Sequence, residues 1–229
     1  MIVKAGDYVM SSTYIVIEGN DGTGKSTQAE LLADYCRQQS REVIVIEEPG
    51  SDDSDKTTPV ANYLRSLIKD GALVRDPEIN LALFSAARRE LWQQKIEPAL
   101  KRGAVVISAR NYVSTLAYQG YGEGIDAKHI MKITRLFTSK RYMRPDCIII
   151  LALDNENERR KRITKRGQVV DTSDTFESRS SNFQKRVDAA YRTIASKLPS
   201  SHVIECYSNG HYKTAEQINV EIQSIVKQL

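Results

Sequence analysis

Hydrophobic and polar positions along the chain form two kinds of pattern: short apolar runs, and longer segments with the spacing of a helix. Short runs rich in apolar residues, typical of buried strands, lie at residues 14–17, 41–47, 104–108, 147–153 and 202–206. Between them, apolar positions and their boundary residues predict helices at about 25–36, 60–70, 77–101, 109–117, 127–139, 156–166, 176–197 and from 214 onwards. Strands that alternate with helices and are apolar throughout are typical of an α/β protein, with a parallel sheet covered on both faces.

The first apolar run leads directly into a glycine-rich segment. Residues 19–26 read G-N-D-G-T-G-K-S, which has the spacing G-x-x-x-x-G-K-S of a loop whose backbone N–H groups cradle a polyphosphate. In such a loop the lysine supplies a charge for the β and γ phosphates and the serine a hydroxyl for magnesium, while the following helix directs its positive end at the anion. The predicted ATP-binding residues are Gly19, Asn20, Asp21, Gly22, Thr23, Gly24, Lys25, Ser26 and Thr27.

Composition and charge narrow the class of protein further. The 229 residues, 41% of them hydrophobic and 27% charged, are enough for one domain over residues 13–229, whereas residues 1–12 show little periodicity and predict a loose N-terminal extension. No apolar run is long enough to span a membrane and no signal segment opens the chain, so we expect a cytoplasmic protein. The net charge of +4 suits an acidic ligand but is too small to indicate nucleic acid.

Cysteine and histidine positions do not indicate a disulfide or a zinc site. Cys36, Cys147 and Cys206 are far apart in apolar surroundings, which predicts buried reduced thiols. The three histidines lack the spacing of metal ligands.

From residue 14 to the C-terminal helix, the order of motifs resembles the thymidylate kinase family of P-loop nucleoside monophosphate kinases. The motifs are E-G-N-D-G-T-G-K-S-T at 18–27, E-P-G at 48–50, L-F-S-A-A-R at 83–88, I-E-P-A-L at 96–100, R-N-Y-V-S-T-L-A-Y-Q-G at 110–120, R-P-D at 144–146, R-G at 166–167 and D-T-F-E at 174–177. The resemblance implies a three-layer P-loop NTPase fold with a five-stranded parallel sheet of order 2-3-1-4-5. It also implies a small lid at about residues 155–176 and a homodimer formed through helical faces.

The same resemblance implies an activity. It is the transfer of the γ-phosphoryl group of ATP to dTMP, giving dTDP for dTTP synthesis, with Mg²⁺ as cofactor. Two alternatives stay open: a kinase for another or modified pyrimidine deoxynucleoside monophosphate, and a nucleotide-binding protein with weakened catalysis. A general P-loop ATPase would use Asp154 as a metal ligand, but Asp154 fits better as the N-cap of the helix that follows it.

The resemblance also implies residues that bind the acceptor nucleotide. Phe84 and Arg88 share a helical face at i and i+4, and in the family such residues stack on the thymine ring and donate to its carbonyl oxygen. Without the motif, Phe84 would read as a core residue. The full predicted set is Asp21 for the sugar 3′-hydroxyl, Phe84, Arg88, Arg110, Ser114, Thr115 and Gln119 near the phosphate or base, and Tyr118 against a ribose 2′-hydroxyl.

Cations are expected on both sides of the transferred phosphoryl group. Lys25 and Arg110 are predicted catalytic residues; the resemblance to the family implies that Arg110 bridges the donor and acceptor phosphates. Residues 159–166 contain six basic side chains in eight positions, a pattern that otherwise indicates a solvated helix face or a nucleic-acid patch. In the family a lid arginine covers the ATP phosphates; we favour Arg166, with Arg159, Arg160 and Arg162 as alternatives.

Three positions depart from the family pattern. Ala109 stands where the family usually has an aspartate that helps to hold magnesium, and Glu47 and Thr175 stand where relatives often have arginines. We therefore predict that Ser26 holds magnesium together with Glu48 or its neighbour Glu47.

Overall fold

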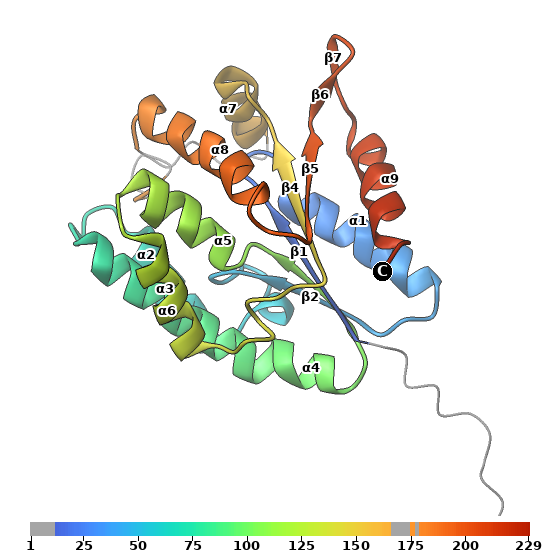
Figure 1. Ribbon diagram of the computed structural model, residues 1–229, viewed down its shortest axis with the longest axis horizontal. Helices are drawn as coiled ribbons and strands as arrows, with labels where there is room; N and C mark the ends of the chain where they lie inside the picture. The colour runs from blue at the N-terminus through green and yellow to red at the C-terminus, as the bar shows by residue number, and fades with distance from the viewer. Residues whose placement is uncertain (1–11, 166–174, 177–178) are drawn as a thin grey trace, which may run out of the picture.

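A computed structural model describes residues 12–165, 175–176 and 179–229 of the chain. Its main sheet contains β1 (Thr13–Glu18), β2 (Val43–Glu47), β3 (Val105–Ala109), β4 (Cys147–Ala152) and β5 (Ser201–Glu205). The strands are parallel and lie in the order β2-β3-β1-β4-β5, which confirms the predicted topology (Figure 1). The carboxyl ends of β1, β2 and β3 therefore meet at one edge of the sheet.

Helices cover both faces of this sheet (Figure 1). Their bounds are α1 (Lys25–Gln38), η1 (Ser54–Lys56), α2 (Pro59–Lys69), α3 (Pro77–Leu91), η2 (Trp92–Ile96), α4 (Glu97–Lys101), α5 (Tyr112–Thr115), η3 (Leu116–Gly122), α6 (Ala127–Phe137), α7 (Glu156–Lys165), α8 (Ser181–Ala195) and α9 (Ala215–Val226). Of these, α1 and α9 lie on one face, and α3 to α6 and α8 contribute to the core on the other.

The two cores follow from the alternation of side chains along each strand. Tyr14 and Val16 of β1 belong to one apolar cluster, while Ile15 and Ile17 belong to the other. Because successive side chains of a strand point to opposite faces, a strand that is apolar throughout must be covered on both sides. All three cysteines are buried and free, as predicted.

The helical segment from 77 to 101 is continuous, as its pattern predicts, but it contains a wider π-helical turn at η2. Pro98 lies just after this turn and has no N–H to donate to a preceding carbonyl. A wider turn is a common way to accommodate such an interruption within a helix.

The prediction of a helix beginning at Phe176 was wrong. Helix α8 begins after Ser180, whose side chain accepts a hydrogen bond from the backbone N–H of Phe183 and so caps the helix. Phe176 lies before the helix, and its ring is 5.8 Å from that of Phe84 and 5.9 Å from that of Tyr118. The apolar residue that suggested a helix face instead lines the cleft described below.

A small hairpin after β5 was not predicted. It pairs β6 (Tyr207–Ser208) with β7 (His211–Tyr212). The two residues between them, Asn209 and Gly210, both have positive φ angles of 52° and 82°, as expected for the tight turn that N-G sequences favour.

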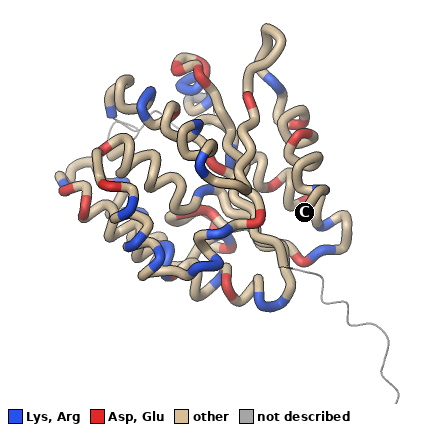
Figure 2. The backbone as a smooth tube through the Cα atoms, in the orientation of Figure 1, with Lys and Arg blue, Asp and Glu red and all other residues tan. Residues whose placement is uncertain are grey.

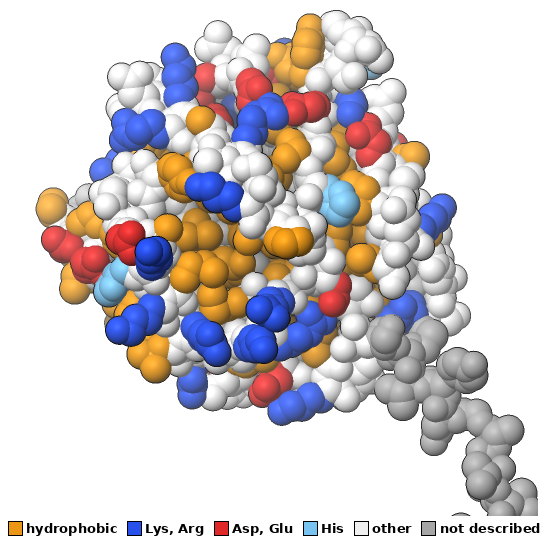
Figure 3. Space-filling model, in the orientation of Figure 1, with side chains coloured by type: hydrophobic (Ala, Val, Ile, Leu, Met, Phe, Trp, Pro, Cys, Tyr) orange, Lys and Arg blue, Asp and Glu red, His pale blue; other side chains and the backbone are white. Residues whose placement is uncertain are grey.

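Charged side chains of both signs are interspersed along the tube (Figure 2), and hydrophobic side chains also reach the visible surface among them (Figure 3). Within the described residues, the helices are too short or too polar to cross a membrane.

Candidate active site

The phosphate loop connects β1 to α1, where the motif places it. Gly19 has a φ of 137°, and a Cβ atom there would lie 2.5 Å from the carbonyl oxygen of Leu151, so only glycine fits. The Nζ of Lys25 donates to the carbonyl oxygen of Asn20 at 2.8 Å. The loop and the helix start that the sequence predicts are therefore present, while their binding to ATP stays a prediction.

Side chains from α8 and η3 fix the position of this loop through hydrogen bonds to Asn20. The Nδ2 of Asn20 donates to Asp188 Oδ1 at 2.8 Å and to Gln184 Oε1 at 3.2 Å, and the hydroxyl of Tyr118 donates to Asn20 Oδ1 at 2.8 Å. Asn20 is 1% exposed, so these contacts satisfy an amide that water does not reach. The loop is thus tied to segments far from it in the sequence.

Arg110 joins the loop to the end of β3. Its guanidinium donates to the carboxylate of Asp21, to the carbonyl oxygen of Gly19 at 3.2 Å and to Ser114 Oγ at 3.0 Å. Burial alone would raise the pKa of Asp21, but the charges of Arg110 and Lys25 hold that pKa well below its ordinary value. Asp21 therefore carries a negative charge that already faces two cations.

The backbone of Arg110 is itself unusual. Its φ is 76°, in the left-handed region that side chains other than glycine, asparagine and aspartate rarely adopt. Such conformations persist where the surroundings impose them, often at functional sites. Here the backbone N–H of Arg110 donates to the carbonyl oxygen of Ile17 at 2.9 Å, which extends the pairing of β3 with β1 and directs the side chain toward the loop.

Glu18 organises the same edge of the sheet, although we did not predict a role for it. It is fully buried, and its carboxylate accepts from the backbone N–H groups of Asn111 and Ser114 at 2.8 and 3.1 Å. The hydroxyls of Ser114 and Tyr191 donate to it at 2.7 and 3.1 Å. A carboxylate at the N-terminus of α5 fits the unsatisfied N–H groups there, so Glu18 fixes the segment that follows Arg110. The one charge in an otherwise apolar strand was the signal for it.

Arg88 is more deeply buried than the other lysines and arginines that line the cleft. It is 2% exposed, and it donates to Glu48 Oε2 at 3.0 Å, to Thr115 Oγ1 at 2.8 Å and to the carbonyl oxygen of Asn111 at 2.9 Å. Its guanidinium carbon lies 5.2 Å from the centre of the Phe84 ring. Phe84 and Arg88 thus share one face of α3, as their spacing predicts.

Glu48 is the partner that keeps this arginine in place. Its Oε2 also accepts from the hydroxyl of Tyr142 at 2.6 Å, while its Oε1 is buried without a hydrogen-bond partner among the described residues. Burial raises the pKa of Glu48 to about 7, against the lowering effect of the Arg88 charge. The carboxylate therefore faces the Arg88–Tyr142 network, and its predicted role as a metal ligand stays a prediction that this position does not favour.

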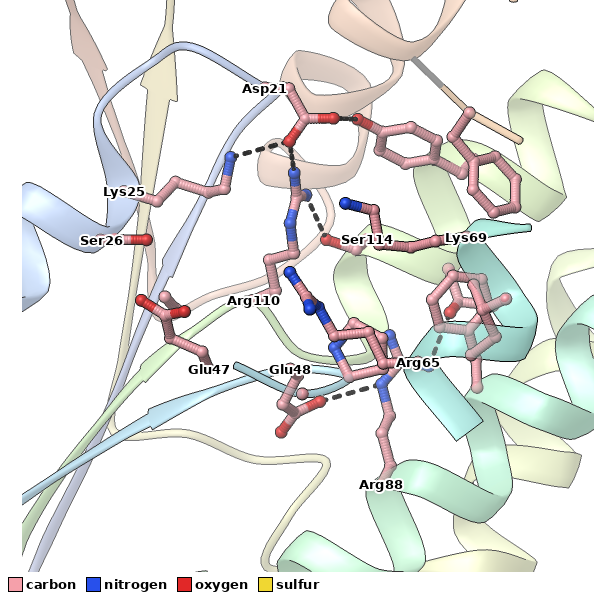
Figure 4. A pocket seen from close by; sticks show the side chains of 18 of the residues that line it. Asp21, Lys25, Ser26, Glu47, Glu48, Arg65, Lys69, Arg88, Arg110 and Ser114 are labelled. Atoms are coloured by element: carbon pink, nitrogen blue, oxygen red, sulfur yellow. Dashed lines mark hydrogen bonds and ion pairs between the residues drawn. The ribbon is translucent and has the colours of Figure 1, made fainter. Parts of the chain in front are cut away.

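Glu47 occupies the other side of the strand end. In Figure 4 its carboxylate points toward the side of the cleft where Ser26 lies, and Ser51 Oγ donates to its Oε2 at 2.8 Å. Ala109, which aligns with Glu47 in the β2–β3 pairing, also lines the cleft. A hydroxyl and a carboxylate are oxygen donors that suit Mg²⁺, which usually takes one or two carboxylates together with substrate phosphates.

These segments enclose a cleft of about 270 Å³ (Figure 4). Its lining contains all the predicted acceptor-binding residues: Asp21, Phe84, Arg88, Arg110, Ser114, Thr115, Tyr118 and Gln119. From the phosphate loop and the start of α1 it also contains Gly22, Gly24, Lys25 and Ser26.

The cleft contains two cations that we did not predict, Arg65 and Lys69. Both belong to α2, lie four residues apart and line the cleft opposite the phosphate loop (Figure 4). Their i, i+4 spacing after the E-P-G motif indicates that the two residues share one face of a helix. Which face of α2 lines the cleft, however, depends on the direction in which the helix runs past it.

Most of the described part of the predicted lid is α7, and Thr175 and Phe176 are described as well. Arg159 is 4% exposed, pairs with Glu156 at 2.8 Å and donates to the carbonyl oxygen of Asp21 at 3.4 Å. A Cβ atom on Gly22 would lie 2.8 Å from the carbonyl oxygen of Arg159, so α7 packs directly on the phosphate loop. Arg166, the favoured catalytic arginine, lies outside the described residues.

A parallel sheet of this order, with a glycine-rich phosphate loop after its central strand and a cation-lined cleft at the same edge, defines a P-loop nucleotide-binding protein. The family model described as thymidylate kinase matches residues 17–218. The chain is 37% identical to a thymidylate kinase of Chlorobium chlorochromatii over 195 residues, which cover 82% of this chain and 84% of the relative. It is 34% identical to a thymidylate kinase of Neorickettsia sennetsu, over 94% of this chain and 96% of that one.

A solved structure agrees with these sequence comparisons. The crystal structure of thymidylate kinase from Ehrlichia chaffeensis is similar with a TM-score of 0.74 and 29% identity, covering 94% of this chain and 99% of the other. The chain therefore belongs to the thymidylate kinase family.

Proposed function

We propose that this protein transfers the γ-phosphoryl group of ATP to dTMP, giving dTDP and ADP. The observation that carries the proposal is the cleft itself, in which Arg110 lies between the phosphate loop and Arg88 (Figure 4) and which Phe84 also lines. Membership of the thymidylate kinase family supports the same reaction.

In this reaction an oxygen of the acceptor phosphate attacks the γ-phosphorus, and the bond to the bridging oxygen of ADP breaks. Little covalent chemistry is required of the protein, so its work is to position two anions and offset their repulsion. Lys25 and the loop amides would hold the donor phosphates. Arg110 would bridge donor and acceptor, because it lies between the loop and the α2–α3 side and because the contacts it makes now, to Asp21 and Ser114, are exchangeable.

The acceptor nucleoside would lie against α3 and η3. Phe84 would stack on the base and Arg88 would donate to its carbonyl oxygen. Ser114, Thr115 and Gln119 supply further polar groups along that wall. Tyr118 would exclude a ribose 2′-hydroxyl, and its hydrogen bond to Asn20 supports a fixed ring position. Asp21 would accept from the 3′-hydroxyl.

Ser26 and the carboxylate of Glu47 fit Mg²⁺ better than Glu48, whose carboxylate is engaged with Arg88 and Tyr142. Bound there, the ion would neutralise charge on the β and γ phosphates. A lid arginine would add a cation, with Arg159 next to the loop and Arg166 as the favoured alternative.

The proposal also covers the oligomeric state and the cellular location of the protein. Exposed apolar side chains on α2, α3 and α6 support a homodimer through helical faces: Val60, Tyr63, Ile79 and Leu136 are 54%, 69%, 51% and 71% exposed. We further propose a cytoplasmic location.

A panel of acceptors tests the proposed reaction. ADP production should be measured by a coupled assay with ATP, Mg²⁺ and each of dTMP, dUMP, dCMP and dGMP, and dTMP should give the highest kcat/KM. A higher value for another pyrimidine nucleotide would indicate a different acceptor. Binding of dTMP and ATP with negligible ADP release would indicate a nucleotide-binding protein instead.

A further inference from the structure

Tyr191 of α8 contacts Arg110, although it is not among the residues that line the cleft. Its side chain is 3% exposed, and its hydroxyl accepts a hydrogen bond from Arg110 Nη1 at 3.4 Å. The sequence analysis assigned it no role. Because Tyr191 lies behind the cleft lining, this contact can persist while Arg110 exchanges partners inside the cleft.

The buried carboxylate of Glu18 sets the direction of two hydroxyl protons beside Arg110. The hydroxyls of Ser114 and Tyr191 both donate to Glu18 Oε2, at 2.7 and 3.1 Å, and their oxygens are 3.1 Å apart. Burial raises the pKa of Tyr191 well above its ordinary value, so its hydroxyl keeps the proton. A hydroxyl has one proton and two acceptor lone pairs. With both protons directed at Glu18, the lone pairs of the two hydroxyls are left for the guanidinium.

The two terminal nitrogens of Arg110 have different kinds of partner. Nη2 donates to the carboxylate of Asp21, which lines the cleft and which a phosphate group can replace. Nη1 donates to the carbonyl oxygen of Gly19 at 3.2 Å and to the hydroxyls of Ser114 and Tyr191 at 3.0 and 3.4 Å. Gly19 and Tyr191 are outside the cleft lining. One end of the guanidinium is thus held by the protein, while the other can change partners.

The helix that carries Tyr191 also holds the phosphate loop. Gln184, Asp188 and Tyr191 have i, i+4 and i+7 spacing, so they share one face of α8. Gln184 and Asp188 accept from the side-chain amide of Asn20 in the loop. The same helix face therefore fixes both the loop and Arg110, and with them the separation between the site proposed for the donor phosphates and the cation proposed to bridge them.

We propose that Tyr191 is a positioning residue for phosphoryl transfer: its hydroxyl, oriented by Glu18, holds Arg110 Nη1 so that Nη2 can meet the phosphates. The inference rests on the proposed function. A long, flexible arginine side chain has many rotamers, and a misplacement of about 1 Å can cost 10²-fold in rate. Tyr191 acts through Arg110 and contacts neither nucleotide.

Separate measurements of rate and binding test this role. Tyr191→Phe removes the hydroxyl alone, and Glu18 keeps its other three donors. In single turnovers at saturating ATP, Mg²⁺ and dTMP, the rate constant of phosphoryl transfer should fall by about 10-fold, as expected for one lost hydrogen bond to a charged group. The Kd values of dTMP and ATP from isothermal titration calorimetry should change less than twofold, because every group that lines the cleft is kept. A general loosening of the site would weaken binding as well.

Tyr112→Phe is the matched control. Tyr112 is 1% exposed and belongs to the same apolar cluster as Tyr191, but its hydroxyl donates to the carbonyl oxygen of Met143 at 3.2 Å, outside the cleft lining. Each variant loses one buried hydroxyl and its hydrogen bonding. Tyr112→Phe should keep the single-turnover rate constant within twofold of wild type, and an equal loss in both variants would overturn the proposal.

A double variant shows whether Tyr191 acts through Arg110. Once Arg110→Gly has removed the guanidinium, adding Tyr191→Phe should lower the remaining rate constant by less than twofold, because no cation is left to position. A further 10-fold loss, or an unchanged rate constant in Tyr191→Phe alone, would overturn the proposal while leaving wild-type dTMP phosphorylation intact. Failure of the wild-type protein to phosphorylate dTMP would remove the proposed function and this inference together.

Discussion

The two sides of the cleft are built on different principles. The phosphate loop is one continuous segment of backbone, and its charged neighbours Lys25, Asp21 and Arg110 are held by ion pairs that a bound nucleotide can replace. The α3 side depends on Arg88, which is buried and donates to three oxygens from distant parts of the chain. The comparison teaches that the phosphate-loop side offers charged groups able to exchange partners, whereas the guanidinium of Arg88, the group proposed to recognise the base, is fixed by its contacts within the protein.

The largest expected effect is on catalysis and comes from removing Arg110, the cation that lies between the two sides of the cleft. Arg110→Gly removes the guanidinium while fitting the backbone φ of 76°. We expect kcat for dTMP phosphorylation to fall by about 10³-fold or more, since arginines that stabilise phosphoryl transfer are worth this much. Thermal unfolding should show a folded protein. A kcat within tenfold of wild type would mean that Arg110 does not bridge the phosphates.

Removing the buried cation, Arg88, should affect the stability of the fold as well as binding. Arg88→Met leaves Glu48 buried without its charged partner, which should lower the free energy of unfolding by about 3–5 kcal/mol at pH 8 in a denaturant titration. The double variant Arg88→Met/Glu48→Gln should recover part of that loss, because no isolated charge stays buried. If the single variant costs less than about 1 kcal/mol, Arg88 is not held as tightly as its contacts imply.

A smaller effect should appear as pH dependence. Burial raises the pKa of Glu48 from 4.5 to about 7, so between these values the folded protein binds a proton that the unfolded chain does not. Stability should therefore decrease as pH rises from about 4.5 to 7, by up to about 3 kcal/mol. Glu48→Gln should flatten this slope in unfolding measurements across the range.

Asp188 provides a control for the pH dependence of stability that is attributed to Glu48. Burial raises its pKa to about 6, so it adds a dependence of the same sign. Asp188→Asn should remove only its own share and leave the part due to Glu48. A slope unchanged in Glu48→Gln would show that Glu48 does not carry the raised pKa.

The same contrast explains what the sequence could predict. The strands and the phosphate loop followed from apolar patterning and a contiguous motif, whereas the strand order and the eight predicted acceptor-binding residues followed from the resemblance to the thymidylate kinase family. The structure confirms the strand order, and the eight residues do line one cleft. Sequence reasoning could not choose between Glu47 and Glu48, because adjacent residues at a strand end point in opposite directions and only the packed structure decides which one faces Arg88.

Other elements depend on contacts that no local pattern encodes. The presence of Arg65 and Lys69 in the cleft lining depends on how α2 passes the cleft, and the position of Phe176 depends on its packing between Phe84 and Tyr118. The hairpin after β5 had an N-G signal, but its strands are only two residues long, too short for an alternating pattern to appear.

The left-handed backbone at Arg110 also bears on how this enzyme could be engineered. Glycine would relieve a conformation that costs other residues roughly 1 kcal/mol, but it would also remove the guanidinium that pairs with Asp21 and donates to Ser114. The same substitution would delete the group proposed to hold two phosphates together. Thermostable variants of this chain should therefore be sought by changing other positions.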